Sequence, residues 1–486
     1  MDGDARRRRG TGGTGAGVGA METIETDYLL IGAGAMGLAF ADTLLTELPD
    51  ARLTIVDRHG KPGGHWNDAY PFVALHQPST FYGVASLPLG AGRIDTHGLN
   101  QGFHELASGP EVSGYFDAVM RRQLLPTGRV RYLPMSDYRG GGRIVSLLSG
   151  RETQVNIARK TIDSTYLATS VPATHTRKFA VAEGVRIMPP NGLPDLWRAP
   201  DSMPRHFTVL GAGKTAMDTI LWLLGAGATP DMISWVAPRA SWFFNRRCVQ
   251  PGREFFEDSV GGQLGLMQAL ATATDAEDLF LRLEACGFML RIDRSIMPGM
   301  FHYAIAAEAE IAILQRITDV IRLGRVLALE EDRMVLAQGE RATPPGTLFI
   351  DCTASAVERR PPVPVFQPGL IVPQMVRVPQ PAFSAALIAW VEANVEGEAA
   401  QNALTMAVPL PDSIADYPRA SLVNLFNQGL WGQHKPLSQW IHDCRLDGFS
   451  KTISAVRPEE TARIAMLQQF RPAAMAAMAN LQRMIG

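Results

Sequence analysis

The feature that most constrains this 486-residue chain is a pattern that occurs twice: an apolar strand, a glycine-rich turn and a helix. In the first copy, the apolar run DYLLI leads into Gly32-Ala-Gly34-Ala-Met-Gly37, and the next apolar run ends in Asp57, 20 residues after Gly37. The glycines let the backbone approach a pyrophosphate, the helix start offers free N–H groups, and the acid accepts hydrogen bonds from a ribose. This order of parts predicts a dinucleotide site.

The second copy of the pattern starts from the apolar run FTVL and continues as Gly211-Ala-Gly213-Lys214-Thr-Ala216 before another helix. Alanine can replace the third glycine because that position mainly needs a small side chain for close packing of helix on strand. The next strand ends without an acid and is followed by Arg239, while Lys214 lies back in the turn. Positive groups therefore stand where a ribose 2′-phosphate would bind, which predicts NADPH rather than NADH.

The acid at position 57 fits either NAD or FAD, and the residues after it favour FAD. The segment RHGKPGGHW, which ends at Trp66, resembles the G-G-x-W segment that follows the first βαβ unit in class B flavin-dependent monooxygenases. The segment Tyr70–Tyr82 resembles the stretch that passes beneath the isoalloxazine ring in that family. The resemblance implies FAD at the first glycine turn. The residues that it assigns to FAD in this segment are Arg58, Gly64, His65 and Trp66.

Two later apolar strands, Thr161–Thr169 and Thr347–Ser355, resemble the strands at which such flavoproteins cross between their FAD and NADPH domains. The family usually has A-T-G there, and the glycine is missing in both copies. In the second strand the resemblance assigns Asp351 and Thr353 to cofactor binding. The implied fold class is α/β, with two Rossmann-like three-layer dinucleotide-binding domains and a helical insertion.

The domain boundaries are predicted from these segments and from periodicity. Apolar residues recur at helical spacing between about 253 and 323, where the Rossmann pattern is lost. The first 20 residues are basic and glycine-rich with too little apolar surface to fold, and whether the chain starts at Met1 or Met21 stays open. The predicted units are a disordered tail at 1–20, a first part of the FAD-binding domain at 21–200, an NAD(P)H-binding domain at 201–346 with the insertion at about 253–323, and the rest of the FAD-binding domain with a C-terminal segment at 347–486.

Composition narrows the range of partners. The chain has 46 basic and 48 acidic residues, so no net field favours nucleic acid or an anionic membrane. The four cysteines lie far apart with no C-x-x-C pair, which predicts a reducing, cytoplasmic location and neither a metal site nor a dithiol centre. No apolar run reaches the roughly 18 residues needed to cross a bilayer. A helical face of the insertion could serve a homodimer.

Two dinucleotide sites in one chain predict that electrons pass from a nicotinamide to a flavin. Without a cysteine pair, the flavin would most simply give them to dioxygen or to a soluble acceptor. The leading hypothesis is a class B type monooxygenase: NADPH reduces FAD, the reduced flavin traps O2 as a hydroperoxide, and one oxygen atom enters a small or medium apolar organic substrate.

Four residues are candidates for this chemistry. His76 and Gln77 are polar groups able to reach a flavin edge, at a place where the family usually has Asp or Asn. Arg239 or Arg246 could stabilise the distal oxygens electrostatically. The Baeyer–Villiger segment F-x-G-x-x-x-H is absent before the second glycine turn, so carbon oxygenation has no support over N- or S-oxygenation. Two alternatives stay open: an NAD(P)H-dependent FAD reductase, dehydrogenase or oxidase, and a non-catalytic flavin-binding escort protein.

Overall fold

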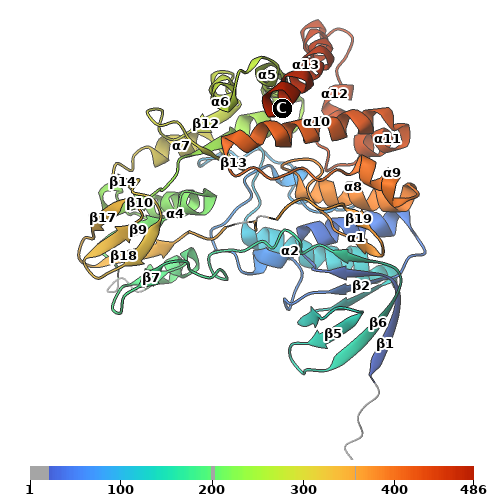
Figure 1. Cartoon of the computed structure of the whole chain (residues 1–486), viewed down its shortest axis with the longest axis horizontal. Helices are drawn as coiled ribbons and strands as arrows, with labels where there is room; N and C mark the ends of the chain where they lie inside the picture. Colours follow the sequence, from blue (N-terminus) through green and yellow to red (C-terminus); the bar gives the residue numbers. More distant parts are fainter. Residues whose placement is uncertain (1–20, 199–202, 356, 359) are drawn as a thin grey trace, which may run out of the picture.

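Two mainly parallel sheets, each with a glycine turn after a central strand, organise the molecule (Figure 1). The structure is a computed structural model that describes residues 21–198, 203–355, 357–358 and 360–486, so the predicted tail at 1–20 lies outside the described residues.

The first sheet collects strands from both ends of the chain. Its strands are β1 (Glu22–Ile31), β2 (Leu53–Val56), β3 (Val130–Leu133), β6 (Glu152–Asp163), β19 (Phe366–Gln367) and β20 (Leu370–Ile371). They lie in the order β19-β20-β6-β1-β2-β3, and all neighbours are parallel except β19 and β20. Ile31 pairs with Val56, so the glycine turn after β1 and Asp57 after β2 start at the same edge. The strand order reverses beside β1, which is where open α/β sheets bind their ligands.

Two helices that are buried over most of their length form the core of this first unit. They are α1 (Ala35–Glu47) and α8 (Pro381–Asn394), which pack against each other. Every residue from Ala35 to Leu45 and from Ala382 to Val391 is buried, as a helix without a polar face requires. The rest of the unit comprises α2 (Gly109–Ala118), α9 (Glu398–Leu404) and the hairpin of β4 (Ser136–Tyr138) and β5 (Arg143–Ser146).

The second sheet repeats the arrangement of the first. Its strands are β8 (Ile187–Met188), β9 (His206–Leu210), β10 (Ile233–Val236), β14 (Val320–Ile321) and β18 (Thr347–Asp351), with α4 (Lys214–Gly225) after β9. All neighbours are parallel in the order β14-β10-β9-β18-β8, so strand order again reverses beside the strand that carries the glycine turn. The α/β fold class with two Rossmann-like units is confirmed.

The chain crosses between the two units at other points than the predicted boundaries at 200 and 347. Both β8 and β18 pair within the second sheet, so the first unit is left after β6 and resumed only after Asp351. A small sheet beside the second unit contains β7 (Ala180–Val181), β15 (Val326–Leu329), β16 (Arg333–Leu336) and β17 (Gly339–Ala342). The small residues at the end of β18 do not show which sheet the strand joins. The pairing of β18 with β9 moves the predicted boundary from 347 to after Asp351.

The predicted insertion at about 253–323 is only partly helical. It contains α5 (Phe256–Thr272) and α6 (Ala276–Ala285), and also β12 (Met289–Arg291) and β13 (Met300–Ala306), which form a sheet with the preceding β11 (Ser241–Asn245). The same range ends with α7 (Glu308–Leu314) and with β14, which belongs to the second sheet. Short buried strands have no reliable period, which is why the sequence did not separate them from helix.

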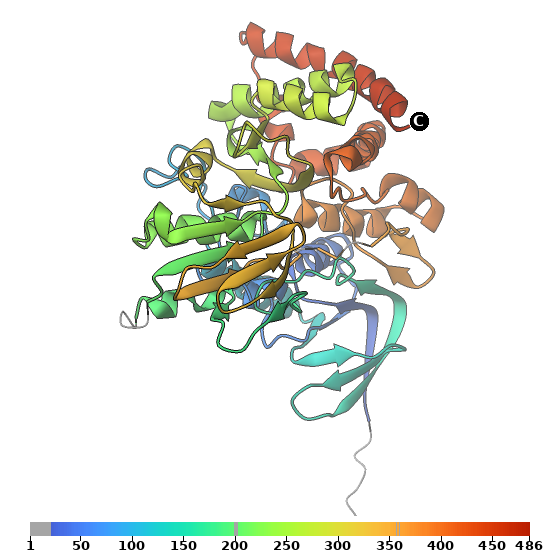
Figure 2. The ribbon, with the colours of Figure 1, turned by 60° about the vertical axis from the view of Figure 1, so that its left-hand side comes forward.

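The insertion is covered by the C-terminal part of the chain. The helix α13 (Thr461–Ile485) lies along α5 (Figure 2) and buries Ala477 and Leu481 in their shared core. The remaining helices are α3 (Leu193–Leu196), α10 (Tyr417–Gln433), α11 (Lys435–Asp443) and α12 (Ser450–Ser454). Among the residues described, no helix combines the length and the apolar character that a bilayer crossing needs.

Candidate functional site

The first glycine turn leaves the start of α1 open toward a ligand. Gly34 is the N-cap of α1, and no side chain caps the free N–H groups of the first helical turn. A Cβ on Gly37 would lie 2.2 Å from the carbonyl oxygen of Gly32, so this glycine is needed for the close approach of helix and turn. The combination of free N–H groups and a positive helix end suits a pyrophosphate.

The G-G-x-W segment packs directly on this turn. The Gly63 N–H donates to the Ala33 carbonyl at 2.8 Å. Gly64 has a φ of +56°, and a Cβ there would lie 2.9 Å from the Cα of Gly34. The sequence therefore places Gly64 where a larger residue would push the segment off the turn.

The next two residues, His65 and Trp66, pack against each other and against Tyr82. Trp66 donates its Nε1–H to the Tyr82 hydroxyl at 2.8 Å, and its ring stacks with that of His65 at 5.4 Å between centroids. Burial lowers the pKa of His65 to about 4, so this imidazole is neutral at pH 7. The segment predicted to contact the flavin is thus held together by its own contacts beside the turn.

Asp57 lies where the ribose acid of a dinucleotide site is expected. Its side chain is 6% exposed, and Oδ2 accepts the N–H of Ala33 in the glycine turn at 2.5 Å. Oδ1 accepts the backbone N–H of His59 at 2.7 Å. Arg58, by contrast, points to Asp137 at 2.7 Å with its side chain 73% exposed, so it lies on the surface rather than in the turn.

The second glycine turn is also open. Gly213 is the N-cap of α4 with no side-chain cap, and a Cβ on Gly213 would meet no atom within 4 Å. Gly211 has a φ of +122°, and Ala216 is completely buried. The small residue at the third position therefore serves helix packing, as predicted from the sequence.

Lys214 does not face the helix start that the sequence assigns to a phosphate. Its side chain is 10% exposed and its ammonium forms ion pairs with Asp218 and, at 3.7 Å, with Glu310. The positive charge next to the second turn is therefore already balanced inside the protein.

Three arginines line a cavity of about 400 Å³ beside the second turn. Ala212 of the turn and Arg239, Arg294 and Arg322 all contribute to its wall. Arg239 pairs with Asp412 at 3.1 Å. Arg294 pairs with Glu284 at 3.4 Å, and Arg322 pairs through Nη2 with Asp293, which also lines the cavity, at 3.3 Å. The Nε of Arg322 is buried and has no hydrogen-bond partner in the structure. A cluster of guanidinium groups at the ends of β10 and β14 suits an anionic group such as a phosphate.

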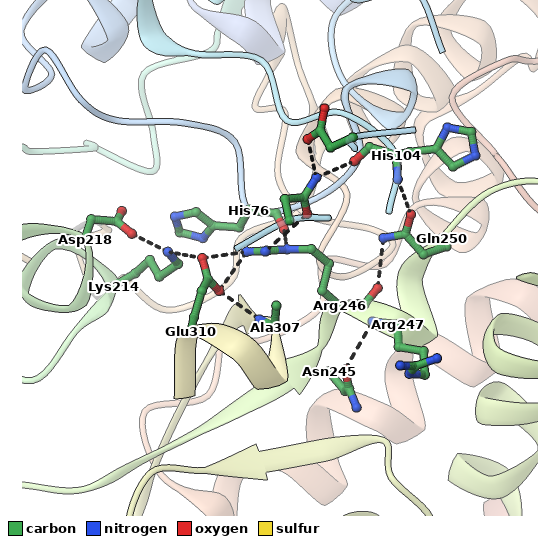
Figure 3. Close-up of polar contacts among 12 residues, drawn as sticks. His76, His104, Lys214, Asp218, Asn245, Arg246, Arg247, Gln250, Ala307 and Glu310 are labelled. Carbon is green, nitrogen blue, oxygen red and sulfur yellow. Dashed lines mark hydrogen bonds and ion pairs between the residues drawn. The ribbon is translucent and has the colours of Figure 1, made fainter. Parts of the chain in front are cut away.

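Arg246 is buried at the junction of the two units rather than facing a nucleotide (Figure 3). It is 1% exposed and donates from Nη2 to both carboxylate oxygens of Glu310, at 3.1 and 2.9 Å. Its Nε–H donates to the His76 carbonyl at 3.1 Å. Burial, followed by the charges of Lys214 and Arg246, holds the pKa of the His76 imidazole well below its usual range. His76 is therefore neutral, and Gln77 beside it is partly exposed.

The segment resembling the stretch beneath the flavin joins the two units. The Tyr70 hydroxyl donates to Asp218 on α4 at 2.8 Å. Phe72 stacks on Trp222 of the same helix at 4.9 Å. With His76 held by Arg246, residues 70–76 of the first unit contact the second unit at three points.

Asp351 and Thr353 lie at the second turn, not with the first unit as their predicted domain implied. Asp351 is 2% exposed, and its Oδ1 accepts the N–H and the hydroxyl of Thr353 at 3.0 and 2.6 Å. The carbonyl of the intervening Cys352 lies 2.5 Å from where a Cβ on Gly211 would be. Burial raises the pKa of the Cys352 thiol to about 12, so this cysteine is not a nucleophile at pH 7.

The first unit contains the same turn at the equivalent place. Asp163 Oδ1 accepts the N–H and the hydroxyl of Thr165 at 2.9 and 2.5 Å. The intervening Ser164 donates its hydroxyl to the carbonyls of Ile31 and Gly32, at 2.7 and 3.0 Å. Ser164 is a site residue that the sequence interpretation missed, although the repeated D-x-T at the ends of two apolar strands was a signal for it.

The comparisons with known proteins give a strong likeness to mycobacterial proteins. No family model matches the chain. It is 44% identical over 455 residues to the uncharacterized protein Rv2000 of Mycobacterium tuberculosis (strain ATCC 25618 / H37Rv), which covers 93% of this chain and 83% of that protein. The chain belongs to the family of this mycobacterial protein.

Two more distant likenesses are to proteins named as monooxygenases. Over 211 residues, 43% of this chain and 36% of the relative, it is 26% identical to the FAD-dependent monooxygenase resA of Aspergillus sclerotiorum. The solved open structure of a cyclohexanone monooxygenase aligns with a TM-score of 0.46 at 13% identity, over 76% of this chain and 88% of that one.

Arg294 and Arg322 are further residues that the sequence did not reveal. Arg322 follows β14 and Arg294 lies between β12 and β13, so both are remote from Arg239 along the chain. Only the pairing of β10 with β14 brings the end of β14 beside the second turn. A pattern search around a glycine turn has no means of detecting this proximity.

Proposed function

We propose that the chain is an FAD-dependent oxidoreductase that takes electrons from NADPH, and that it acts as a monooxygenase on a small or medium apolar organic substrate. One observation carries the proposal. Two units of the same strand order each present an uncapped helix start beside the reversal of strand order, and residues 70–76 of the first unit contact the second. Such a pair suits two dinucleotides whose reactive rings meet between the units.

The first turn fits FAD. The open start of α1 would hold the pyrophosphate, and Asp57 would accept hydrogen bonds from the ribose hydroxyls. Gly64 allows the backbone near Gly34, where a Cβ would intrude. When bound there, FAD supplies the ability to accept a hydride and to react with dioxygen.

The second turn and its cavity fit NADPH better than NADH. Arg239 and Arg322 reach the cavity from the ends of two neighbouring strands. The unpartnered Nε–H of Arg322 is a donor that a 2′-phosphate would satisfy. Neither Lys214 nor Arg246 is part of this proposal, because their carboxylate partners are nearly buried, whereas Arg322 pairs with the more exposed Asp293.

The monooxygenase activity is supported by the distant relative named as an FAD-dependent monooxygenase and by the balance of the buried charges at the junction. The neutral imidazole of His76 and the buried pair of Arg246 with Glu310 leave this face of the junction without a net charge from these groups. A water-poor site of this kind protects reactive oxygen species from hydrolysis.

One observation favours a second candidate, an NADPH-dependent flavin reductase or oxidase. The sequence assigned stabilisation of oxygen to Arg239 or Arg246, yet Arg239 pairs with Asp412 and Arg246 with Glu310. If neither cation is released during turnover, dioxygen would leave as hydrogen peroxide.

Oxygen consumption separates the two candidates. Protein saturated with FAD is mixed with NADPH in air, and peroxide is measured with and without catalase while candidate amines, sulfides and ketones are screened for a product that carries one atom of ¹⁸O from ¹⁸O2. Labelled product with one NADPH consumed per oxygen atom inserted supports the monooxygenase. Peroxide equal to the NADPH consumed with every substrate contradicts it and supports the oxidase.

A further inference from the structure

One histidine joins the acid of the first dinucleotide site to the G-G-x-W segment. His59 follows β2 and Asp57 by two residues. Its Nδ1 lies 3.0 Å from Asp57 Oδ1, and its Nε2 lies 2.8 Å from Asp68 Oδ2. The side chain is one-third exposed, whereas Asp57 is nearly buried. Asp68 directly follows the short helical turn at Gly64–Asn67, so the imidazole spans two segments of the site.

Both ring nitrogens of His59 face a carboxylate, and a neutral imidazole can donate from only one of them. The arrangement therefore requires the doubly protonated ring. The hydrogen bond to Asp57 and then that to Asp68 outweigh burial and raise the pKa of His59 to about 9. The other titratable group that acts on this ring is His65, which is neutral at pH 7.

The contacts of Asp57 show what the histidine does for it. Oδ2 accepts the N–H of Ala33 in the glycine turn. Oδ1 accepts both the backbone N–H and the ring of His59, which fixes the rotation of the carboxylate. Oδ2 keeps a second lone pair for a ribose hydroxyl.

We propose that His59 is a positioning residue of the flavin nucleotide site: it aims the carboxylate of Asp57 at the ribose and ties Asp68, and with it the G-G-x-W segment, to the glycine turn. The inference rests on the proposed binding of FAD at the first turn. It adds a residue that touches neither ribose nor pyrophosphate but sets the geometry of the groups that do.

Two near-isosteric variants separate the two contacts of His59. In His59→Asn the side-chain amide can replace the Nδ1 donor toward Asp57, whereas in His59→Gln it can replace the Nε2 donor toward Asp68. The Kd of FAD is measured by quenching of flavin fluorescence on the apoprotein between pH 7 and pH 10. His97→Asn, a change in an exposed histidine of the first unit, is the matched control.

For the wild type and the His97→Asn control, the Kd of FAD should stay constant up to pH 8 and rise about 3-fold by pH 10, because the neutral ring loses its charge and one of its two donors but keeps the donor to Asp57. His59→Gln should have a Kd raised about 10-fold already at pH 7. His59→Asn should stay within about 3-fold of the wild type at pH 7 because it keeps the donor to Asp57. In both variants the Kd should no longer depend on pH.

A wild-type Kd that does not change between pH 7 and pH 10, or variants that keep the wild-type pH dependence, would overturn the role of His59. If one variant fails to fold, the other one, compared with His97→Asn over the same pH range, decides the question. Failure of the wild type to bind FAD at any pH would instead contradict the proposed function, while an unchanged Kd of NADPH in both variants confines the effect to the first site.

Discussion

Replacing Glu310 by glutamine tests the buried ion pair at the junction of the two units. Glu310 accepts two contacts from the Arg246 guanidinium and the N–H of Ala307 at 2.8 Å. Since Arg246 is 1% exposed, the change leaves a buried cation without its main counter-charge. Breaking a buried pair from one side costs about 3–5 kcal/mol. We expect E310Q to lower the free energy of unfolding by about 3 kcal/mol, the lower end, because glutamine still accepts a hydrogen bond.

A double-mutant cycle measures the pair itself. Urea unfolding, followed by tryptophan fluorescence, gives the free energy of the transition for the wild type, E310Q, R246M and the double variant. Removing both charges leaves no unpaired charge, so the double variant should lose at least about 2 kcal/mol less than the sum of the single losses. The matched control is E257Q, whose carboxylate is 60% exposed and pairs with Arg463 at 2.7 Å; it should cost less than about 1 kcal/mol.

The pH dependence has a defined sign. Burial raises the pKa of Glu310, but the charges of Lys214 and Arg246 outweigh it and hold that pKa below its usual value. A carboxyl with a lowered folded pKa stabilises the fold above its unfolded pKa of about 4.3, and this contribution is lost as the pH falls through the folded value. The difference between wild type and E310Q should therefore shrink below about pH 4. If E310Q costs no more than E257Q, or the single costs add within about 0.5 kcal/mol, the reasoning is refuted.

Two other substitutions test the nucleotide sites. R322L should raise the Kd of NADPH about 10-fold or more, because a charge-assisted hydrogen bond is lost, and leave that of NADH unchanged. The control R247L should change neither Kd, since the Arg247 guanidinium lies over Phe103. If R322L weakens the binding of NADPH and NADH equally, a 2′-phosphate site is contradicted. G64A should weaken FAD binding at least about 10-fold, because its φ of +56° and the 2.9 Å contact with Gly34 exclude a Cβ and the conformation alone costs about 1–2 kcal/mol. The control is G114A, where the added Cβ meets nothing within 4 Å and the Kd of FAD should not change. If a titration gives G64A the wild-type Kd of FAD, the proposed close approach of the Gly64 backbone to Gly34 is contradicted.

Local patterns predicted the two glycine turns and the fold class because each depends on residues close together in the chain. Gly32, Gly37 and Gly211 lie where strand, turn and helix require them. Asp57 likewise reaches the turn through a strand that directly neighbours β1. These features need no knowledge of distant parts of the molecule.

The sequence was least informative about charges. Lys214 and Arg246 resemble phosphate-binding cations in the sequence, but Asp218 pairs with Lys214, and Glu310, 64 residues after Arg246, pairs with Arg246. Arg322 reaches the arginine cavity only through the pairing of β10 with β14. Whether a cation is free depends on long-range contacts, and these follow from the sheet rather than from a motif. The cytoplasmic location and a homodimer stay predictions.

The central claim is that electrons cross from NADPH to FAD within one chain, and anaerobic stopped-flow spectroscopy tests it most directly. The protein is loaded with FAD, freed of unbound flavin, and mixed with NADPH while the long-wavelength flavin absorbance is recorded. The account predicts one tightly bound FAD per chain, with absorbance that bleaches faster with NADPH than with NADH. A protein that retains no FAD, or whose bound FAD stays oxidised in the presence of NADPH, would contradict it.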